Sequence, residues 1–188
     1  MITCPNCGTE NPERAKFCLE CASALGQGVA RQSGTRKLVT VLFADVVGST
    51  ALGERLDPET LRGLLARYFA AAKQVVERHG GTIEKFIGDA VMAVFGIPQL
   101  HEDDALRGVR AALELRAAIS ALNEQVAQER GLRIEFRIGL NSGDVVAGGG
   151  NDATLVTGDA VNVAARLEQA AGGSQILIGA TTYSLVRD

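Results

Sequence analysis

The chain has 188 residues and a formal net charge of −3, and 46% of its residues are hydrophobic, 22% charged and 4% aromatic. Such a chain can bury one core of ordinary size. It has no excess of basic residues for a nucleic acid and no apolar run near the roughly 18 residues of a membrane span. Because Met1–Cys4 lacks the basic and apolar start of a signal peptide, we expect a cytoplasmic protein that contacts neither nucleic acid nor membrane.

All four cysteines lie in the first 21 residues, as the pairs Cys4/Cys7 and Cys18/Cys21. Two CxxC pairs at this spacing are typical of one tetrahedral Zn²⁺ site with four thiolate ligands. Two disulfides are an alternative for an exported chain, and a redox CxxC would account for only one pair. The stretch CPNCGTENPERAKFCLECASAL resembles the zinc ribbons that begin many bacterial multidomain proteins. Residues 1–26 are therefore predicted to bind one structural Zn²⁺, and their slight acidic excess favours a protein contact over a nucleic acid.

Residues 27–35 are small and polar without an apolar period, which predicts a linker between the ribbon and the main domain. Leu38–Ala44 is a β-branched apolar run, which predicts a strand buried on both faces. Asp57-Pro58 is a helix start signal, and the apolar residues that follow at helical spacing predict a long amphipathic helix. Gly80-Gly81 is expected to end this helix.

The rest of the main domain continues the alternation of strands and helices. Thr82–Phe86 and Ala90–Phe95 are predicted to form a hairpin. The remaining predicted elements are a helix at Asp103–Glu129, a strand at Ile134–Leu140 that Asp144–Ala147 continues or follows, a helix at Asp159–Ala170, a strand at Gln175–Ile178 and a helix at Ala180–Val186. The order β-α-β-β-α-β with an extension predicts an α+β, ferredoxin-like fold.

Two aspartates stand at turns where they could carry chemistry. Asp45 ends the first strand and precedes the small residues Gly48-Ser49-Thr50, while Asp89 lies at the tip of the hairpin. Each alone is better explained as a common strand-end or turn residue without a function. If the hairpin lies beside the first strand, the two carboxylates can meet, and joint ionisation then requires cations. Two Mg²⁺ ions would satisfy both and could clamp the oxygens of a phosphoryl substitution.

Three segments, FADVVGST, EKFIGDAVMAVFG and GDAVNVAARLE, resemble in order and spacing the class III nucleotidyl cyclases, the catalytic domains of adenylate and guanylate cyclases. The resemblance covers about residues 36–188, and a zinc ribbon ahead of such a domain resembles bacterial soluble-adenylate-cyclase-like proteins. It implies that Asp45, Asp89 and the carbonyl of Val46 bind two Mg²⁺ or Mn²⁺ ions. It also implies that the backbone amides of four successive residues hold the triphosphate: Val47, Gly48, Ser49 and Thr50.

The same resemblance assigns the residues that would read the nucleotide. Lys85 matches the lysine that donates to adenine, Asn162 the asparagine that orients the ribose, and Arg166 the arginine that stabilises charge on the α-phosphate. Leu155 stands where the family usually has an aspartate or threonine as its second base-reading residue. Leucine cannot bond the adenine amino group, so Thr154 or Thr157 is a substitute if the strand register differs.

The resemblance implies a homodimer with two shared sites, in which one chain gives Asp45 and Asp89 and the other gives Lys85, Asn162 and Arg166. It implies an adenylate cyclase, which converts ATP to 3′,5′-cyclic AMP and pyrophosphate by two-metal-assisted attack of the ribose 3′-hydroxyl on the α-phosphate. The alternatives are a guanylate cyclase, or a non-catalytic nucleotide-binding or dimerisation module with a partner at the zinc ribbon. Family members continue beyond the last predicted helix, so we expect a chain truncated at its C-terminus.

Overall fold

The computed structural model describes residues 1–4, 6–23, 25, 35–148 and 156–187. In the N-terminal part, β1 (Ile2–Thr3) and β2 (Glu10–Asn11) form a short antiparallel pair, and Cys4, Cys18 and Leu25 make a small buried cluster. The predicted linker lies outside the described residues except for Thr35, which begins the first strand of the main domain.

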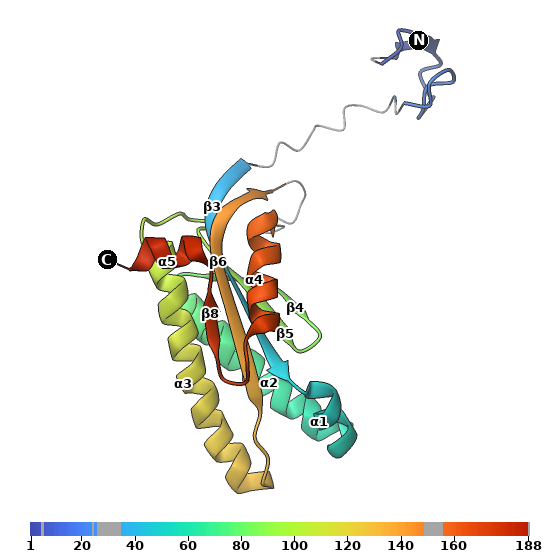
Figure 1. Ribbon diagram of the computed structural model, residues 1–188. Coiled ribbons are helices and arrows are strands. Elements are labelled where there is room, and N and C mark those ends of the chain that lie inside the picture. The colour runs from blue at the N-terminus through green and yellow to red at the C-terminus, as the bar shows by residue number, and fades with distance from the viewer. Residues whose placement is uncertain (5, 24, 26–34, 149–155, 188) are drawn as a thin grey trace.

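The main domain is built on one mixed sheet with helices on both faces (Figure 1). Its strands are β3 (Thr35–Val47), β4 (Thr82–Ile87), β5 (Ala90–Phe95), β6 (Glu135–Ala147), β7 (Val156–Thr157) and β8 (Ile176–Ile178). Its helices are α1 (Ser49–Arg55), α2 (Pro58–Arg78), α3 (Asp104–Arg130), α4 (Asp159–Ala170) and α5 (Ala180–Val186). The order β4-β5-β3-β6-β7, with β8 parallel to β6, confirms the predicted ferredoxin-like arrangement.

The two faces of β3 are covered by different helices, which explains its continuous apolar sequence. Leu42 and Ala44 belong to the core under α2 and α3, whereas Val41 and Phe43 pack in a second cluster with Ala164 of α4. Side chains alternate along a strand, so Asp45 continues the row that faces α4.

Pairing with β6 makes β3 longer than the predicted Leu38–Ala44. The register runs from Thr35 opposite Ala147 to Val47 opposite Glu135, so backbone pairing extends the strand through polar ends that carry no apolar signal. For the same reason β6 is one continuous strand rather than two segments.

The helix boundaries follow local signals. The Asp57 carboxylate accepts a hydrogen bond of 2.9 Å from the Thr60 backbone N–H and caps α2 as predicted. Gly131, with φ 64°, ends α3 in the left-handed region.

Among the described residues, no helix combines the length and apolarity needed to cross a membrane. The predicted cytoplasmic location stays a prediction.

Gly139 determines how closely α4 approaches the sheet. A Cβ atom at this position would overlap the Glu168 backbone N and the Ala164 carbonyl O, and would lie 2.8 Å from the Glu168 Cα. The backbone of α4 therefore rests directly on β6. The absence of a side chain at Gly139 permits this close approach.

Candidate functional site

The two predicted metal-binding carboxylates lie at the same end of the sheet. Ala44 of β3 pairs with Val91 of β5, so the chain continues to Asp45 on one strand and back to Asp89 at the hairpin turn on the other. Burial raises the pKa of Tyr68, and the charges of Asp45 and Asp89 raise it further. The Tyr68 hydroxyl donates a 3.0 Å hydrogen bond to the Ala44 carbonyl, so it supports the backbone next to Asp45.

Arg137 lies directly opposite Asp45 in the β3–β6 register. Its Nη2 donates a 2.7 Å hydrogen bond to the Asp45 Oδ2, its Nε forms an ion pair with Glu168 of α4, and its Nη1 lies 3.4 Å from the Gln169 carbonyl. The hydrogen bond to Asp45 raises the pKa of Arg137, and burial raises the pKa of Glu168. Sequence reasoning missed both partners, because only the pairing register and the approach of α4 bring them to Asp45.

The chemistry of this donor set fits a divalent cation. Among the described residues, Asp45, Asp89 and Glu168 all act electrostatically on Tyr68, and the Arg137 guanidinium pairs with two of them, so carboxylates are in excess at this end of the sheet. Carboxylate oxygens are the ligands that Mg²⁺ prefers in proteins. The side chain of Val46 has no ligand atom and is buried in the core, so only its backbone carbonyl could serve as a ligand.

The segment that follows Asp45 turns sharply into α1. Val47 is the last residue of β3, and Gly48, at φ 70°, occupies the left-handed region that favours glycine. Ser49 then begins α1, and the Leu52 N–H bonds to the Gly48 carbonyl at 3.0 Å. The first amides of α1 thus begin four residues after Asp45, and their binding of a phosphate stays a prediction. Thr50 lies in α1, but its side chain is outside what the structure describes.

A β-bulge directs Lys85 to the α4 side of the sheet. The β4–β5 register shifts between Ile83 and Lys85, which places Glu84 and Lys85 consecutively on one face. Phe86 then returns to the opposite face, where its ring packs 4.7 Å from that of Phe69 on α2. Lys85 Nζ lies 3.2 Å from the carboxylate of Glu84, whose side chain is only 6% exposed. Glu84 is a further residue near the site that the sequence did not single out.

The predicted nucleotide-binding residues of α4 point away from Asp45. Asn162 and Arg166 are exposed, and within the described part of the chain neither bonds to Asp45 or Asp89. At 100° per residue they lie about 120° and 160° around the helix from Glu168, which faces Arg137. Thr157 of β7 is exposed, and Leu155 lies outside the described residues. One chain thus brings together the carboxylates but not the residues predicted to bind the nucleotide.

The four cysteines of the N-terminal part converge, and all four sulfur atoms lie within 4.8 Å of one another. Cys4 and Cys21 are 3.6 Å apart, as are Cys7 and Cys18, far longer than a disulfide bond. These distances match the edge of about 3.8 Å of a tetrahedron with Zn–S bonds of about 2.3 Å. Hydrogen bonds with the hydroxyl and backbone of Ser23 lower the pKa of Cys21 to about 5.

Comparison with protein families accounts for both parts of the chain. The adenylate and guanylate cyclase catalytic domain matches residues 32–188. The chain belongs to this family. A zinc-ribbon domain matches residues 3–25.

Relatives of this class III cyclase chain include enzymes named for both nucleotides. An adenylate cyclase of Anabaena cylindrica is 35% identical over 167 residues, which cover 83% of this chain but only 31% of the relative. The adenylyl cyclase CyaB from P. aeruginosa has a TM-score of 0.78 and 37% identity, with 82% of each chain covered. The guanylyl cyclase Cya2 has a TM-score of 0.77 and 38% identity, with 83% of this chain and 81% of that chain covered.

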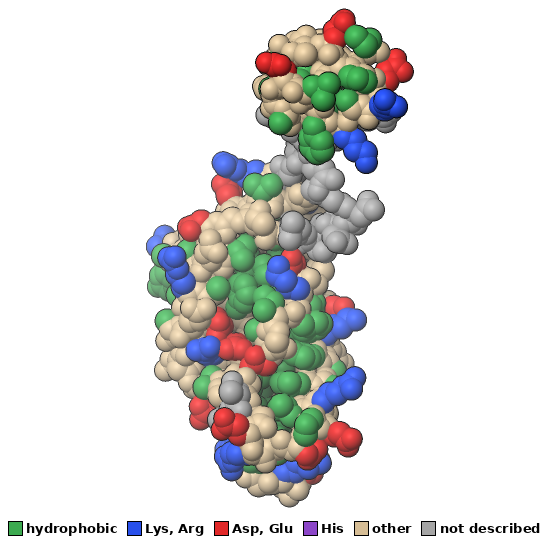
Figure 2. Space-filling view, turned by 90° about the vertical axis from the view of Figure 1, so that its right-hand side faces the viewer, with side chains coloured by type: hydrophobic (Ala, Val, Ile, Leu, Met, Phe, Trp, Pro, Cys, Tyr) green, Lys and Arg blue, Asp and Glu red, His purple; other side chains and the backbone are tan. Residues whose placement is uncertain are grey.

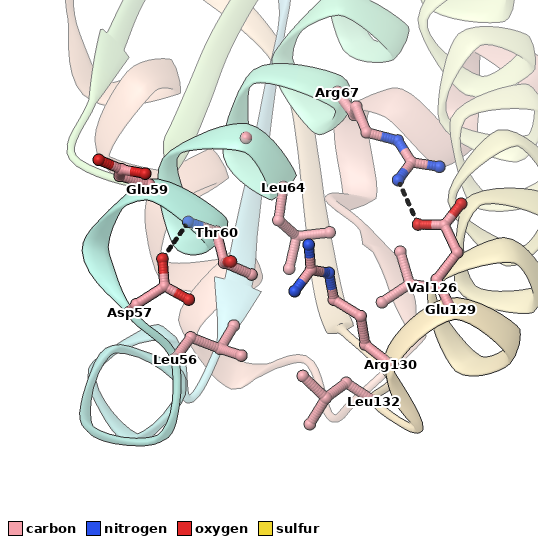
Figure 3. A pocket seen from close by; sticks show the side chains of 11 residues that line it. Leu56, Asp57, Glu59, Thr60, Leu64, Arg67, Val126, Glu129, Arg130 and Leu132 are labelled. Carbon is pink, nitrogen blue, oxygen red and sulfur yellow. Dashed lines mark hydrogen bonds and ion pairs between the residues drawn. The ribbon is translucent and has the colours of Figure 1, made fainter.

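The cyclase domain also has a recess of about 370 Å³ between the start of α2 and the end of α3 (Figure 3). Leu64, Val126 and Leu132 line it, and Arg67 pairs with Glu129 at 3.2 Å across its rim. None of the predicted site residues lines this recess. The nucleotide site predicted from the sequence is therefore separate from it.

Proposed function

We propose that this chain is the catalytic domain of an adenylate cyclase that forms 3′,5′-cyclic AMP and pyrophosphate from ATP. The observation that carries the proposal is the pair Asp45 and Asp89 at one end of the sheet in a chain of the cyclase family. Because the chain spans only 31% of a curated relative's length, the activity of the whole protein is part of the proposal.

Each site residue has a defined task in this reaction. Asp45 and Asp89, with the Val46 carbonyl, would hold two Mg²⁺ or Mn²⁺ ions, which when bound act as Lewis acids on the phosphates. The amides from Val47 to Thr50 would bind the triphosphate. As the ribose 3′-hydroxyl attacks the α-phosphate and pyrophosphate leaves, Arg166 would stabilise the developing charge. Asn162 would orient the ribose for this attack.

A homodimer would complete the site. Glu168 faces Arg137 on the buried side of α4, so no rotation of this helix could also direct Arg166 to the carboxylates of its own chain. A second copy can supply what one chain does not. Large hydrophobic side chains remain exposed on β3, on β6 and at the β4–β5 hairpin: Leu38, Phe86, Ile87 and Val146. Hydrophobic side chains gather on the face shown in Figure 2, as an association surface would require.

Lys85 supports adenine as the base, because an ammonium donates to the N1 acceptor of adenine whereas guanine carries a donor there. A guanylate cyclase is the second candidate, because the guanylyl cyclase Cya2 is as similar to this chain as the adenylyl cyclase CyaB. Leu155 cannot bond the adenine amino group, which weakens the selectivity for adenine without favouring guanine.

The first experiment is the formation of cyclic nucleotide from ATP and from GTP, with Mn²⁺ and with Mg²⁺. We expect cyclic AMP from the unmodified chain, none from Asp45→Ala, and unchanged activity from Asp144→Ala, an exposed aspartate on the same sheet. Product from GTP alone would favour the guanylate cyclase. No product from either nucleotide by folded protein would favour the non-catalytic module.

Mixed chains test the shared site. Asp45→Ala and Arg166→Ala should each be nearly inactive alone, and their mixture should regain activity because one hybrid site in the heterodimer is intact. Dimerising variants that regain nothing when mixed would exclude a site shared between chains.

We also propose that residues 1–26 are a zinc ribbon that holds one structural Zn²⁺ through Cys4, Cys7, Cys18 and Cys21, joined by the linker 27–35 to the cyclase domain 36–188. The spacing of the four sulfur atoms supports the ion. Metal analysis of the purified chain should give about one zinc per chain, and Cys18→Ser should lose most of it. A ribbon variant with unchanged zinc would refute the assignment. A protein contact through the ribbon remains the predicted use of this domain.

A further inference from the structure

Arg137 joins two parts of the chain that the shared-site arrangement assigns to different active sites. It bonds to Asp45 on β3 and forms an ion pair with Glu168 on α4. Asp45 belongs to the metal-binding half of one site. The same α4 carries Asn162 and Arg166, which would complete the other site. A single guanidinium therefore lies between both halves.

Burial makes this link strong. The Glu168 side chain is 7% exposed, that of Asp45 16% and that of Arg137 28%. A buried carboxylate is costly without a cation, so Glu168 depends on Arg137 more than the more exposed Asp45 does. Arg137 also reaches the Gln169 carbonyl, 3.4 Å from its Nη1, which adds a second contact with α4.

A cation at Asp45 would compete with Arg137 for the same carboxylate. Arg137 Nη2 occupies the Oδ2 atom at 2.7 Å, and a divalent ion beside it would repel the guanidinium. The remaining partners of Arg137, Glu168 and the Gln169 carbonyl, both belong to α4. A cation bound to Asp45 would therefore release the Arg137 guanidinium from β3 and leave it bonded to α4 alone.

We propose that Arg137 is a positioning residue that couples metal occupancy at Asp45 to the order of α4, and thereby links the two active sites of the dimer. The proposal rests on the proposed function, because it takes Asp45 as a metal ligand. In this arrangement a metal ion in one site stabilises the helix that presents Asn162 and Arg166 to the other.

The test is hydrogen–deuterium exchange of the α4 peptide, 159–170, with and without Mn²⁺ and without nucleotide. In the unmodified chain we expect Mn²⁺ to slow exchange in α4 by about threefold or more. Arg137→Gln should bind Mn²⁺ at least as tightly, since a competing cation is gone, but its α4 exchange should no longer respond. Arg133→Gln, at an exposed arginine four residues earlier, should behave like the unmodified chain.

Two further variants keep the test decisive. Arg137→Gln leaves Glu168 buried without a cation, so the double variant Arg137→Gln/Glu168→Gln removes the whole pair as a neutral replacement. Arg137→Lys restores the charge and should restore part of the response. An α4 response to Mn²⁺ that survives in the double variant would overturn the proposal.

Separate measurement of Mn²⁺ binding distinguishes failure of the metal site from failure of the coupling. If Mn²⁺ binds the unmodified chain and this binding is lost in Asp45→Asn, but α4 does not respond, the coupling is wrong and the metal site stands. If calorimetry finds no Mn²⁺ binding that depends on Asp45, both the metal site and the coupling are overturned.

Discussion

Replacing Gly139 by alanine should displace α4 from the sheet. The new Cβ would overlap backbone atoms of Glu168 and Ala164, and backbone cannot rotate away as the end of a long side chain can. Overpacking of a core typically costs 1–3 kcal/mol, and contact with backbone places this case at about 3 kcal/mol or more. For a chain of this size, such a loss lowers the melting temperature by about 6–12 °C.

Urea and thermal unfolding followed by circular dichroism would measure this loss. Gly63→Ala is the matched control, because a Cβ at this exposed position of α2 would meet nothing within 4 Å. Alanine in a helix interior is better than glycine by roughly 0.5–1 kcal/mol, so this variant should be slightly more stable than the unmodified chain. If Gly139→Ala unfolds within about 0.5 kcal/mol of the unmodified chain, the close contact between α4 and β6 is wrong.

Three further substitutions test other parts of the fold. Tyr68→Phe removes the buried hydrogen bond to the Ala44 carbonyl and should reduce the free energy of unfolding by about 0.5–1.5 kcal/mol in urea, with no loss expected if that bond is absent. Ser142→Ala should cost about 1–3 kcal/mol in the same assay, because it leaves two buried threonine hydroxyls, 2.8 and 3.0 Å away, without their shared partner. Asp57→Ala removes the α2 cap. The Thr60 N–H lowers the pKa of Asp57, so the cap stabilises the fold above the carboxyl's ordinary pKa and is lost as pH falls through the lowered value. The stability difference from the unmodified chain should therefore be largest at neutral pH and shrink in acid, and a difference independent of pH would contradict the capping role.

Local sequence signals predicted most of the elements because each signal acts within a few residues. The predicted helix at Ala180–Val186 coincides with α5, and that at Asp159–Ala170 coincides with α4. The ends of β3 were missed, because residues there belong to the strand through pairing with β6 rather than through their own apolar character.

The carboxylates of the candidate site could be predicted, but the groups that hold them could not. Asp45 and Asp89 stand at recognisable turns, whereas Arg137 reaches Asp45 across 92 residues of sequence. Its position in an alternating strand looks like that of an ordinary surface arginine. Gly139 gave no signal either, since its role depends on a helix that forms 20 residues later.

The way α4 is held bears on the proposed catalysis. On its buried side, the absence of a side chain at Gly139 and the ion pair from Arg137 to Glu168 fix both the distance and the rotation of the helix. Because a helix is rigid, fixing its buried side also fixes the positions of Asn162 and Arg166 on its exposed side. A guanidinium that stabilises a transition state is most effective when it needs no reorganisation. In the proposed shared site, the packing beneath α4 would therefore hold Arg166 in place for a substrate bound by the other chain. Substitutions on the buried side should therefore reduce the catalytic rate of the site completed by α4, although none of those residues would touch the nucleotide there.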